Sequence, residues 1–115
     1  MIKIRRIYEP EGPDEHYKVL IDRLWPRGIS KEKAGWDEWL KEISPSNELR
    51  KWYNHDPAKW NEFKRLYEAE LTHMKDELKR LKELEITHGT LTMLTSTKDT
   101  EHNHAVALKE FLSGI

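Results

Sequence analysis

The sequence contains no cysteine, so disulfides, thiolate ligands for metals and cysteine nucleophiles are all excluded. It also has almost no net charge, because 20 lysines and arginines nearly balance 21 aspartates and glutamates. Such a chain produces no overall field that attracts nucleic acid or a membrane surface, so affinity for an anion must come from a local cluster. No apolar stretch approaches the roughly 20 residues of a membrane span, and the opening MIKIRRIYEP lacks the apolar centre of a signal peptide. We therefore expect a cytosolic protein without a membrane partner.

Three stretches predict strands. Residues 2–8 (IKIRRIY) place isoleucines between charged residues, as in a half-buried strand, and residues 17–24 (YKVLIDRL) contain the continuous apolar centre of a strand covered on both faces. The connection 9–16 (EPEGPDEH) is too short for a crossover helix, so these two strands are either antiparallel neighbours or not paired with each other. Residues 89–96 (GTLTMLTS) are rich in threonine and aliphatic side chains and predict the last strand.

Helices are expected between and after these strands. Ser30 can cap a first helix, while Ser44 before Pro45 and Asp56 before Pro57 each offer an N-cap followed by proline in the first helical position. The apolar face expected after Ser30 consists of Trp36, Trp39, Leu40 and Ile43.

The apolar stripe that begins at Trp60 continues to Leu81. One helix of this extent would be long for a globular domain, so we expect a break near Thr72–His73. Asp99 or Thr100 is expected to begin a closing helix. Its inward face would consist of Ala105, Leu108, Phe111 and Leu112.

This order of elements predicts an α/β fold. We expect one small layered domain over residues 1–115, with three or so strands, at least two of them parallel, covered by four to five helices. In open α/β sheets, ligands bind beyond the carboxyl ends of the parallel strands. That rule brings together two stretches that are far apart in the sequence, DRLWPRG (22–28) after the second strand and STKDTEHNHA (96–105) after the last.

Arg23 and Arg27 are the first candidates for anion binding, because a guanidinium offers phosphate or carboxylate a planar, two-point fork. Lys98 would add a point charge, and the first turn of the closing helix would add free N–H groups. The alternative is that Arg27 and Lys98 are merely solvated. In that alternative, Arg23 is consumed in an internal ion pair with one of three acids: Asp22, Glu38 or Asp99.

Asp22 and His104 are the candidates for moving a proton. Asp22 ends a buried strand, where it could act as a general base or bind ribose hydroxyls, although a structural role in holding Arg23 or capping a turn is favoured. His104 faces inward from the first helical turn, where the helix N-terminus favours its neutral form, so it is either a proton carrier or a satisfied core residue. Asn103 could contact a ligand or, preferably, cap the turn, and His55 could reach the site from the start of another helix.

Trp25, in the arginine loop, is the one candidate stacking platform. The other four tryptophans have helical apolar spacing and are expected in the core: Trp36, Trp39, Trp52 and Trp60. Pro26 and Gly28 suit the second and fourth positions of a type I turn, so we expect them to shape the loop. His102 and His104 lie about 200° apart on a helix and cannot share one ion without distortion, so neither a metal nor another cofactor is expected.

Together these residues resemble the YeaO-like family of small bacterial and archaeal proteins, the short branch of domain of unknown function 488. The matching text is YKVLIDRLWPRGISKEKAGWDEWLKEISPSNELRKW, HDPAKWNEFKRLYEAEL and LTMLTSTKDTEHNHAVALKEFL, and the resemblance covers residues 4–112. It implies an α/β fold but no particular activity. The positions that match the family motif are Asp22, Arg23, Trp25, Pro26, Arg27, Gly28, Lys98, Asp99 and Asn103. Longer relatives carry cysteines near residues 94–96 and 102–103, so any thiol chemistry proposed for them cannot carry over to this chain.

Two functional hypotheses follow. The first is a small cytosolic protein that binds a phosphate-bearing or carboxylate-bearing small molecule, such as a nucleotide, with enzymatic activity left open. The second is a non-catalytic interaction or regulatory module that docks a protein or a nucleic-acid backbone through the arginine loop. Near-zero net charge argues against strong sequence-independent binding of nucleic acid. A third, structural reading is that the motifs only hold the fold together.

Overall fold

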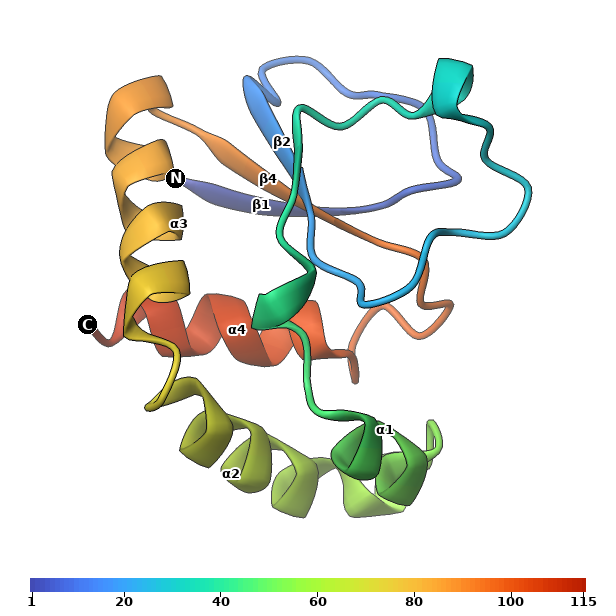
Figure 1. Cartoon of the computed structure of the whole chain (residues 1–115), viewed down its shortest axis with the longest axis vertical. Helices are drawn as coiled ribbons and strands as arrows, with labels where there is room; N and C mark the ends of the chain where they lie inside the picture. Colours follow the sequence, from blue (N-terminus) through green and yellow to red (C-terminus); the bar gives the residue numbers. More distant parts are fainter.

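Four parallel strands form one sheet in the computed structural model, which describes residues 1–115 (Figure 1). Their order across the sheet is β1-β4-β2-β3. The strands are β1 (Ile2–Arg6), β2 (Tyr17–Leu20), β3 (Glu38–Trp39) and β4 (Leu91–Thr95). Because β4 pairs with both β1 and β2, the first two strands of the sequence are not paired with each other, which settles the alternative left open above. The α/β class is confirmed.

The last strand, β4, lies inside the sheet between β1 and β2, and it is buried along its whole length. Its side chains alternate between the two faces of the sheet. Leu91 and Met93 join a large core of 18 buried residues that the helices cover, whereas Leu94 joins a smaller core with Ile7 and Leu20. The apolar centre of β2 is likewise fully buried, as the sequence predicts for a strand covered on both faces.

The helices lie mainly on one face of the sheet. They are α1 (Asn47–Tyr53), α2 (Trp60–Leu71), α3 (Lys75–His88) and α4 (His104–Ser113). Three short 3-10 turns also occur, η1 (Lys31–Lys33) before β3, η2 (Lys41–Ile43) before α1 and η3 (Pro57–Lys59) before α2. Figure 1 shows α4 crossing beside the sheet, α2 and α1 beyond it, and α3 next to the ends at which β1 and β4 begin. The break expected near Thr72–His73 is confirmed, because α2 ends at Leu71 and α3 begins at Lys75.

The prediction of a helix after Ser30 is wrong. Ser30 caps only the single turn η1, and the chain then extends into β3, which pairs with Val19 and Leu20. Trp36 and Trp39 pack over the smaller core, on the face of the sheet that carries no helix. Packing against the edge of the sheet therefore overrides a spacing that also suits a helix.

Two other helix starts differ from the expected positions. The cap of α1 is Ser46, whose Oγ accepts a hydrogen bond from the N–H of Leu49, so neither Ser44 nor Pro45 begins the helix. Helix α4 begins at His104 instead of near Asp99. Asp56 and Pro57 do start a helical segment as expected, the turn η3 that leads directly into α2.

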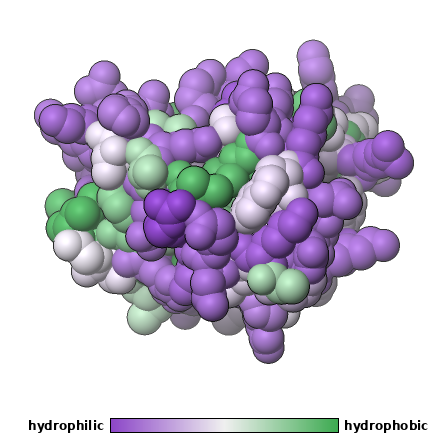
Figure 2. Space-filling view, turned by 90° about the horizontal axis from the view of Figure 1, so that it is seen from below, coloured by the Kyte–Doolittle hydropathy of each residue, from purple (hydrophilic) through white to green (hydrophobic).

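The surface is strongly polar. Figure 2 shows hydrophilic residues over most of the face seen from below, with hydrophobic residues visible only in limited areas between them. None of the helices has the length and apolar character required to cross a bilayer.

Candidate functional site

A cleft of about 840 Å³ lies where β1, β2 and β4 end. All nine candidate site residues from the sequence line this one cleft, although they come from three separate stretches of the chain. They are Asp22, Arg23, Trp25, Arg27, His55, Lys98, Asp99, Asn103 and His104. The stretches that follow the carboxyl ends of the parallel strands therefore line one cleft, at the place where ligands bind in open α/β sheets.

The cleft has two walls. The sheet wall consists of Arg6 and Tyr8 and of the stretches 22–27 and 96–104. The helix wall consists of residues 44–55, which carry α1 and its flanking turns, together with Phe63. The two walls are joined by hydrogen bonds at Arg23 and at Tyr53, whose hydroxyl donates to the carbonyl of His102 at 2.9 Å.

Six basic side chains line the cleft, against only two acidic ones, Asp22 and Asp99. The basic residues are Arg6, Arg23, Arg27, Arg50, Lys51 and Lys98. None of the six forms an ion pair, although lysines and arginines elsewhere commonly do, as Arg5 does with Glu15 and Arg80 with Glu38. A chain of net charge −1 thus concentrates uncompensated positive charge in one place.

Arg23 has backbone partners instead of a carboxylate. Its Nε and Nη2 donate to the carbonyl of Pro45 at 3.3 Å, and Nη2 also donates to the carbonyl of Ser44 at 3.1 Å. The ion pair with Asp22, Glu38 or Asp99 considered above does not form. The guanidinium therefore keeps its charge uncompensated while it ties the end of β2 to the helix wall.

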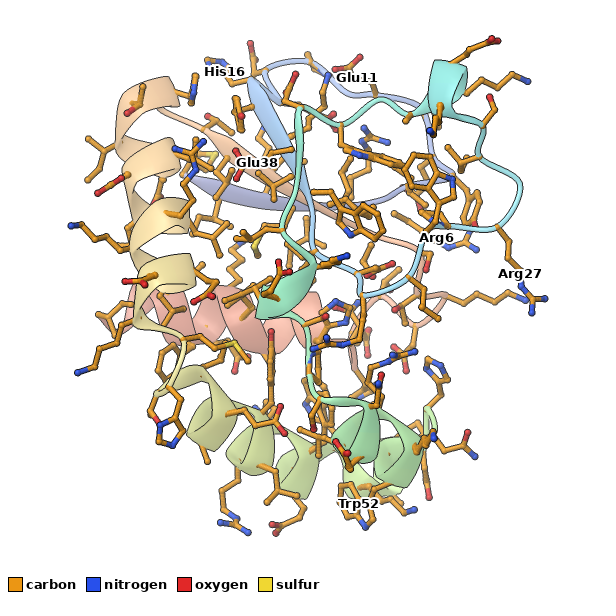
Figure 3. All side chains as sticks on the ribbon, viewed as in Figure 1. Arg6, Glu11, His16, Arg27, Glu38 and Trp52 are labelled. Carbon is orange, nitrogen blue, oxygen red and sulfur yellow. The ribbon has the colours of Figure 1, made fainter.

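Arg27 and Lys98 are both exposed and have no side-chain partner in the protein. Figure 3 shows Arg27 at the margin of the molecule, on the same side as Arg6. The loop below Arg27 is fixed, because the hydroxyl of Tyr8 donates to the Arg27 carbonyl at 2.8 Å. A fixed backbone with a free guanidinium is an arrangement that can recognise an anion arriving from solvent.

Arg6 was not among the candidates from the sequence. Its guanidinium lies over the Tyr8 ring, 4.9 Å from the ring centroid, and its buried Nε has no hydrogen-bond partner. Arg6 is the last residue of β1, so the carboxyl-end rule finds it once β1 is known to run parallel to β4. The sequence did not point to Arg50 or Lys51, because charged residues on a helix usually lie on its solvent-exposed face.

Asp22 is a structural junction. Oδ1 accepts from the hydroxyl of Thr95 at 2.8 Å, and Oδ2 accepts from both the N–H and the hydroxyl of Ser96 at 2.8 Å. Burial alone raises the pKa of this carboxyl, but the interactions with His104 and the hydrogen bonds from Ser96 outweigh burial and lower the pKa to about 2. The carboxylate therefore stays ionised and joins the ends of β2 and β4.

His104 contacts the same junction from the start of α4. Its Nε2 lies 3.1 Å from the carbonyl oxygen of Ile21 and 3.2 Å from Oδ1 of Asp22. Both atoms are acceptors, so Nε2 carries a hydrogen. The hydroxyl of Ser96 donates to Asp22 and not to the imidazole, so the nucleophile-to-base contact of covalent catalysis is not present.

The loop before α4 is held by its own side chains. Asp99 accepts hydrogen bonds from the N–H groups of Glu101 and His102 at 2.9 Å, and these bonds, together with the His102 side chain, lower the pKa of Asp99. Asn103 caps α4, since its Oδ1 accepts from the N–H of Val106 at 3.0 Å. The capping role preferred for Asn103 is therefore confirmed, and Asp99 also has a structural role.

Trp25 is only partly free to stack. Its Nε1 donates to the carbonyl of Ile29, and its ring makes edge contacts with Trp36 and Trp39, yet the side chain remains 37% exposed at the cleft. The expectation that the other tryptophans are buried is wrong for Trp52, which is 40% exposed on α1. Figure 3 shows Trp52 far from the sheet.

His55 lies at the outer end of the helix wall. It is exposed and lines the cleft, and it follows Asn54 in a pair of residues with left-handed backbone, with φ values of 46° for Asn54 and 55° for His55. Such conformations are uncommon for residues other than glycine and hold only where the surrounding structure fixes them. No group of three or more potential metal-ligating side chains occurs.

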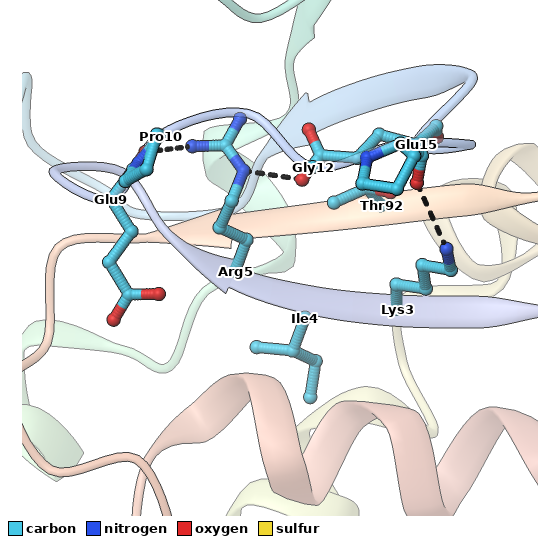
Figure 4. Close-up of a pocket in the computed structure, with 9 residues that line it drawn as sticks. Lys3, Ile4, Arg5, Glu9, Pro10, Gly12, Glu15 and Thr92 are labelled. Carbon is cyan, nitrogen blue, oxygen red and sulfur yellow. Dashed lines mark hydrogen bonds and ion pairs between the residues drawn. The ribbon is translucent and has the colours of Figure 1, made fainter.

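A second, smaller cavity of about 320 Å³ lies beside the middle of β1, under the loop that follows it (Figure 4). Its charges balance, because two basic side chains, Lys3 and Arg5, face two acidic ones, Glu9 and Glu15, and Arg5 pairs with the buried Glu15 at 2.5 Å. Lys3 donates to the carbonyl of Pro13. This cavity therefore lacks the net positive charge that distinguishes the cleft.

Comparison with known proteins gives a consistent result over the whole chain. The family model described as the inactive DUF488-N3 subclade matches residues 1–114. The uncharacterized protein YeaO of Escherichia coli (strain K12) is 41% identical over 114 residues, which cover 99% of this chain and 98% of that protein. The uncharacterized protein Rv3073c of Mycobacterium tuberculosis (strain ATCC 25618 / H37Rv) is 37% identical over 113 residues, with 98% and 94% coverage.

No solved structure matches the chain. The resemblance to YeaO-like proteins that the DRLWPRG and KDTEHNHAV motifs carry is confirmed. The chain belongs to the inactive DUF488-N3 subclade.

Proposed function

We propose that this protein binds a small molecule bearing phosphate or carboxylate groups in the cleft, without converting it chemically. The observation that carries the proposal is the set of six basic side chains that line one cleft and form no ion pair with a carboxylate. Unpaired charges within one concavity keep their capacity for an external anion, and guanidinium groups suit its planar oxygens.

Binding without turnover is favoured over catalysis for two reasons. The family description calls the subclade inactive. In addition, Asp22 and His104, the two candidates for proton transfer, contact each other and the strand ends, while no nucleophile contacts the imidazole. In this proposal both residues position the sheet wall, and the basic side chains contact the ligand.

The test is a calorimetric titration of the protein with a panel of nucleotides, sugar phosphates and inorganic phosphate. At least one member should bind, and Arg27→Lys should weaken binding by about 1 to 3 kcal/mol, because lysine keeps the charge but loses the two-point fork. The melting temperature should hardly change, since Arg27 is exposed. Arg65→Lys, on the exposed face of α2, is the matched control and should bind like wild type.

Arg23→Lys should reduce both binding and stability, because lysine cannot make the contacts of Arg23 with the carbonyls of Ser44 and Pro45 together. If no member of the panel binds, and Arg27→Lys melts like wild type, small-anion binding is the wrong function.

The second candidate function, a docking module, has one observation in its favour. Leu24, in the arginine loop, is 64% exposed beside the partly exposed Trp25. An apolar side chain next to unpaired arginines is common in surfaces that contact other proteins. This candidate becomes the leading one if the panel of small anions fails.

A further inference from the structure

The basic residues of the cleft are divided between its two walls. Arg6, Arg27 and Lys98 belong to the sheet wall, and Arg50 and Lys51 belong to α1 in the helix wall. Arg23 comes from the sheet wall but donates to carbonyls of the helix wall, and so joins the two. A ligand that fills the cleft therefore meets positive charge from two directions.

The size of the cleft exceeds the needs of a single phosphate group. Its volume of about 840 Å³ is near the upper end of the range for small-molecule sites, roughly 300 to 1,000 Å³. Six basic and two acidic side chains leave a net formal charge of about four positive units, histidines taken as neutral. One phosphate monoester carries only about −1.5 to −2 at neutral pH, so two phosphate groups match this charge.

The free atoms also lie on both walls. On the sheet wall, the exposed side chains of Arg27 and Lys98 make no hydrogen bond or ion pair within the protein. On the helix wall, Arg50 contacts only the side-chain oxygen of Asn47, at 3.0 Å, and Lys51 is exposed. Each wall can therefore supply its own set of donors to an anionic group.

We propose that the ligand carries two linked phosphate groups, one held by the sheet wall and the other by Arg50 and Lys51 of the helix wall. This inference rests on the proposed function and specifies its ligand class as an organic or inorganic diphosphate. The exposed ring of Trp25 at the cleft is available to the organic part of such a ligand.

The experiment compares orthophosphate with pyrophosphate by calorimetry at fixed ionic strength. Wild type should bind pyrophosphate at least about tenfold more tightly, since the second phosphate gains charge-assisted hydrogen bonds of its own. The double variant Arg50→Ala/Lys51→Ala should lose this preference, because its affinity for pyrophosphate should fall at least about tenfold more than its affinity for orthophosphate. Lys31→Ala/Lys33→Ala removes the same charge from η1, away from the cleft lining, and should keep the preference.

The remaining outcomes separate the two proposals. Equal binding of orthophosphate and pyrophosphate by wild type would overturn the diphosphate inference and leave the anion cleft intact. An equal loss of affinity for both ions in the Arg50/Lys51 variant would overturn the assignment of one phosphate group to each wall. Failure of both ions and of every other member of the panel above to bind wild type would overturn the proposed function as well.

Discussion

Asp22 shows how a polar residue at a strand end can serve the fold instead of the chemistry expected of it. Its two oxygens receive hydrogen bonds from Thr95, Ser96 and His104, and its own carbonyl accepts from Trp39 at 2.6 Å. Four segments of the chain therefore meet at one residue. The structural role favoured from the sequence agrees with this geometry, whereas the number of partners depends on tertiary contacts that the sequence pattern does not encode.

The stability that Asp22 contributes should depend on pH. Because its pKa falls from 3.8 in the unfolded chain to about 2 in the folded protein, the contribution is fully present above pH 4 and is lost as the pH falls towards 2. Asp22→Asn should therefore lower the free energy of unfolding by about 2 kcal/mol at pH 7. Urea unfolding of both proteins from pH 7 down to pH 2 measures this difference, which should shrink below about pH 4 and be mostly lost at pH 2.

Asp14→Asn is the matched control for Asp22. Asp14 is exposed and has left-handed backbone, which asparagine also tolerates. Its substitution should have little effect at any of these pH values. A stability difference at Asp22 that stayed constant down to pH 2 would contradict the low pKa.

At the scale of elements, the arginine loop depends on Gly28. Its φ of 77° is in the left-handed region, and no atom lies within 4 Å of the position that a Cβ would take. Gly28→Val should thus cost about 1 to 3 kcal/mol of stability through backbone strain alone, and it should weaken anion binding because Arg27 moves with the loop.

Gly89 provides the comparison for this prediction. It has a φ of 79°, also with open space around the Cβ position, and it ends α3 far from the cleft lining. Gly89→Val should lower the melting temperature by a similar amount and leave anion binding unchanged. If Gly28→Val lost binding but melted like wild type, the loop-shaping role of Gly28 would be wrong.

The elements also show which parts of the sequence were informative. The buried runs of β2 and β4 and the break after Leu71 follow from apolar patterning, and these were predicted. The segment 30–43 was not, because Trp36 and Trp39 have helical spacing but are held by contacts with Trp25 and the smaller core. Of the helix wall only His55 was predicted, because only the tertiary structure brings Arg50 and Lys51 into the same cleft as the strand ends.

At the scale of the whole molecule, the sheet depends on its last strand. β4 supplies all the ladder contacts of β1 and joins β1 to β2, which share none. A fragment of residues 1–88 should therefore keep no strand pairing beyond the two residue pairs of β2 with β3, and it should expose most of the large core. Far-ultraviolet circular dichroism should find it largely unfolded, although α2 and α3 can retain some helix.

The full chain with Met93→Leu is the control for this fragment, because a volume-conserving change inside β4 should leave the fold intact. A fragment with dispersed amide signals and a cooperative melting transition would contradict the central role of β4. The single domain and the cytosolic location expected from the sequence stay predictions.

The central position of β4 also has a consequence for synthesis. Ile2 pairs with Leu91, so at about 5 to 20 residues per second β1 waits on the order of 5 to 20 seconds after its own translation for its partner. During that interval an unpaired apolar strand is prone to aggregate, and charged residues within it oppose aggregation. β1 carries three charged residues, Lys3, Arg5 and Arg6. β4 carries no charged residue, and it is the last strand to be synthesised, when β1 and β2 are already available for pairing. The distribution of charge among the strands thus matches the order in which the ribosome releases them.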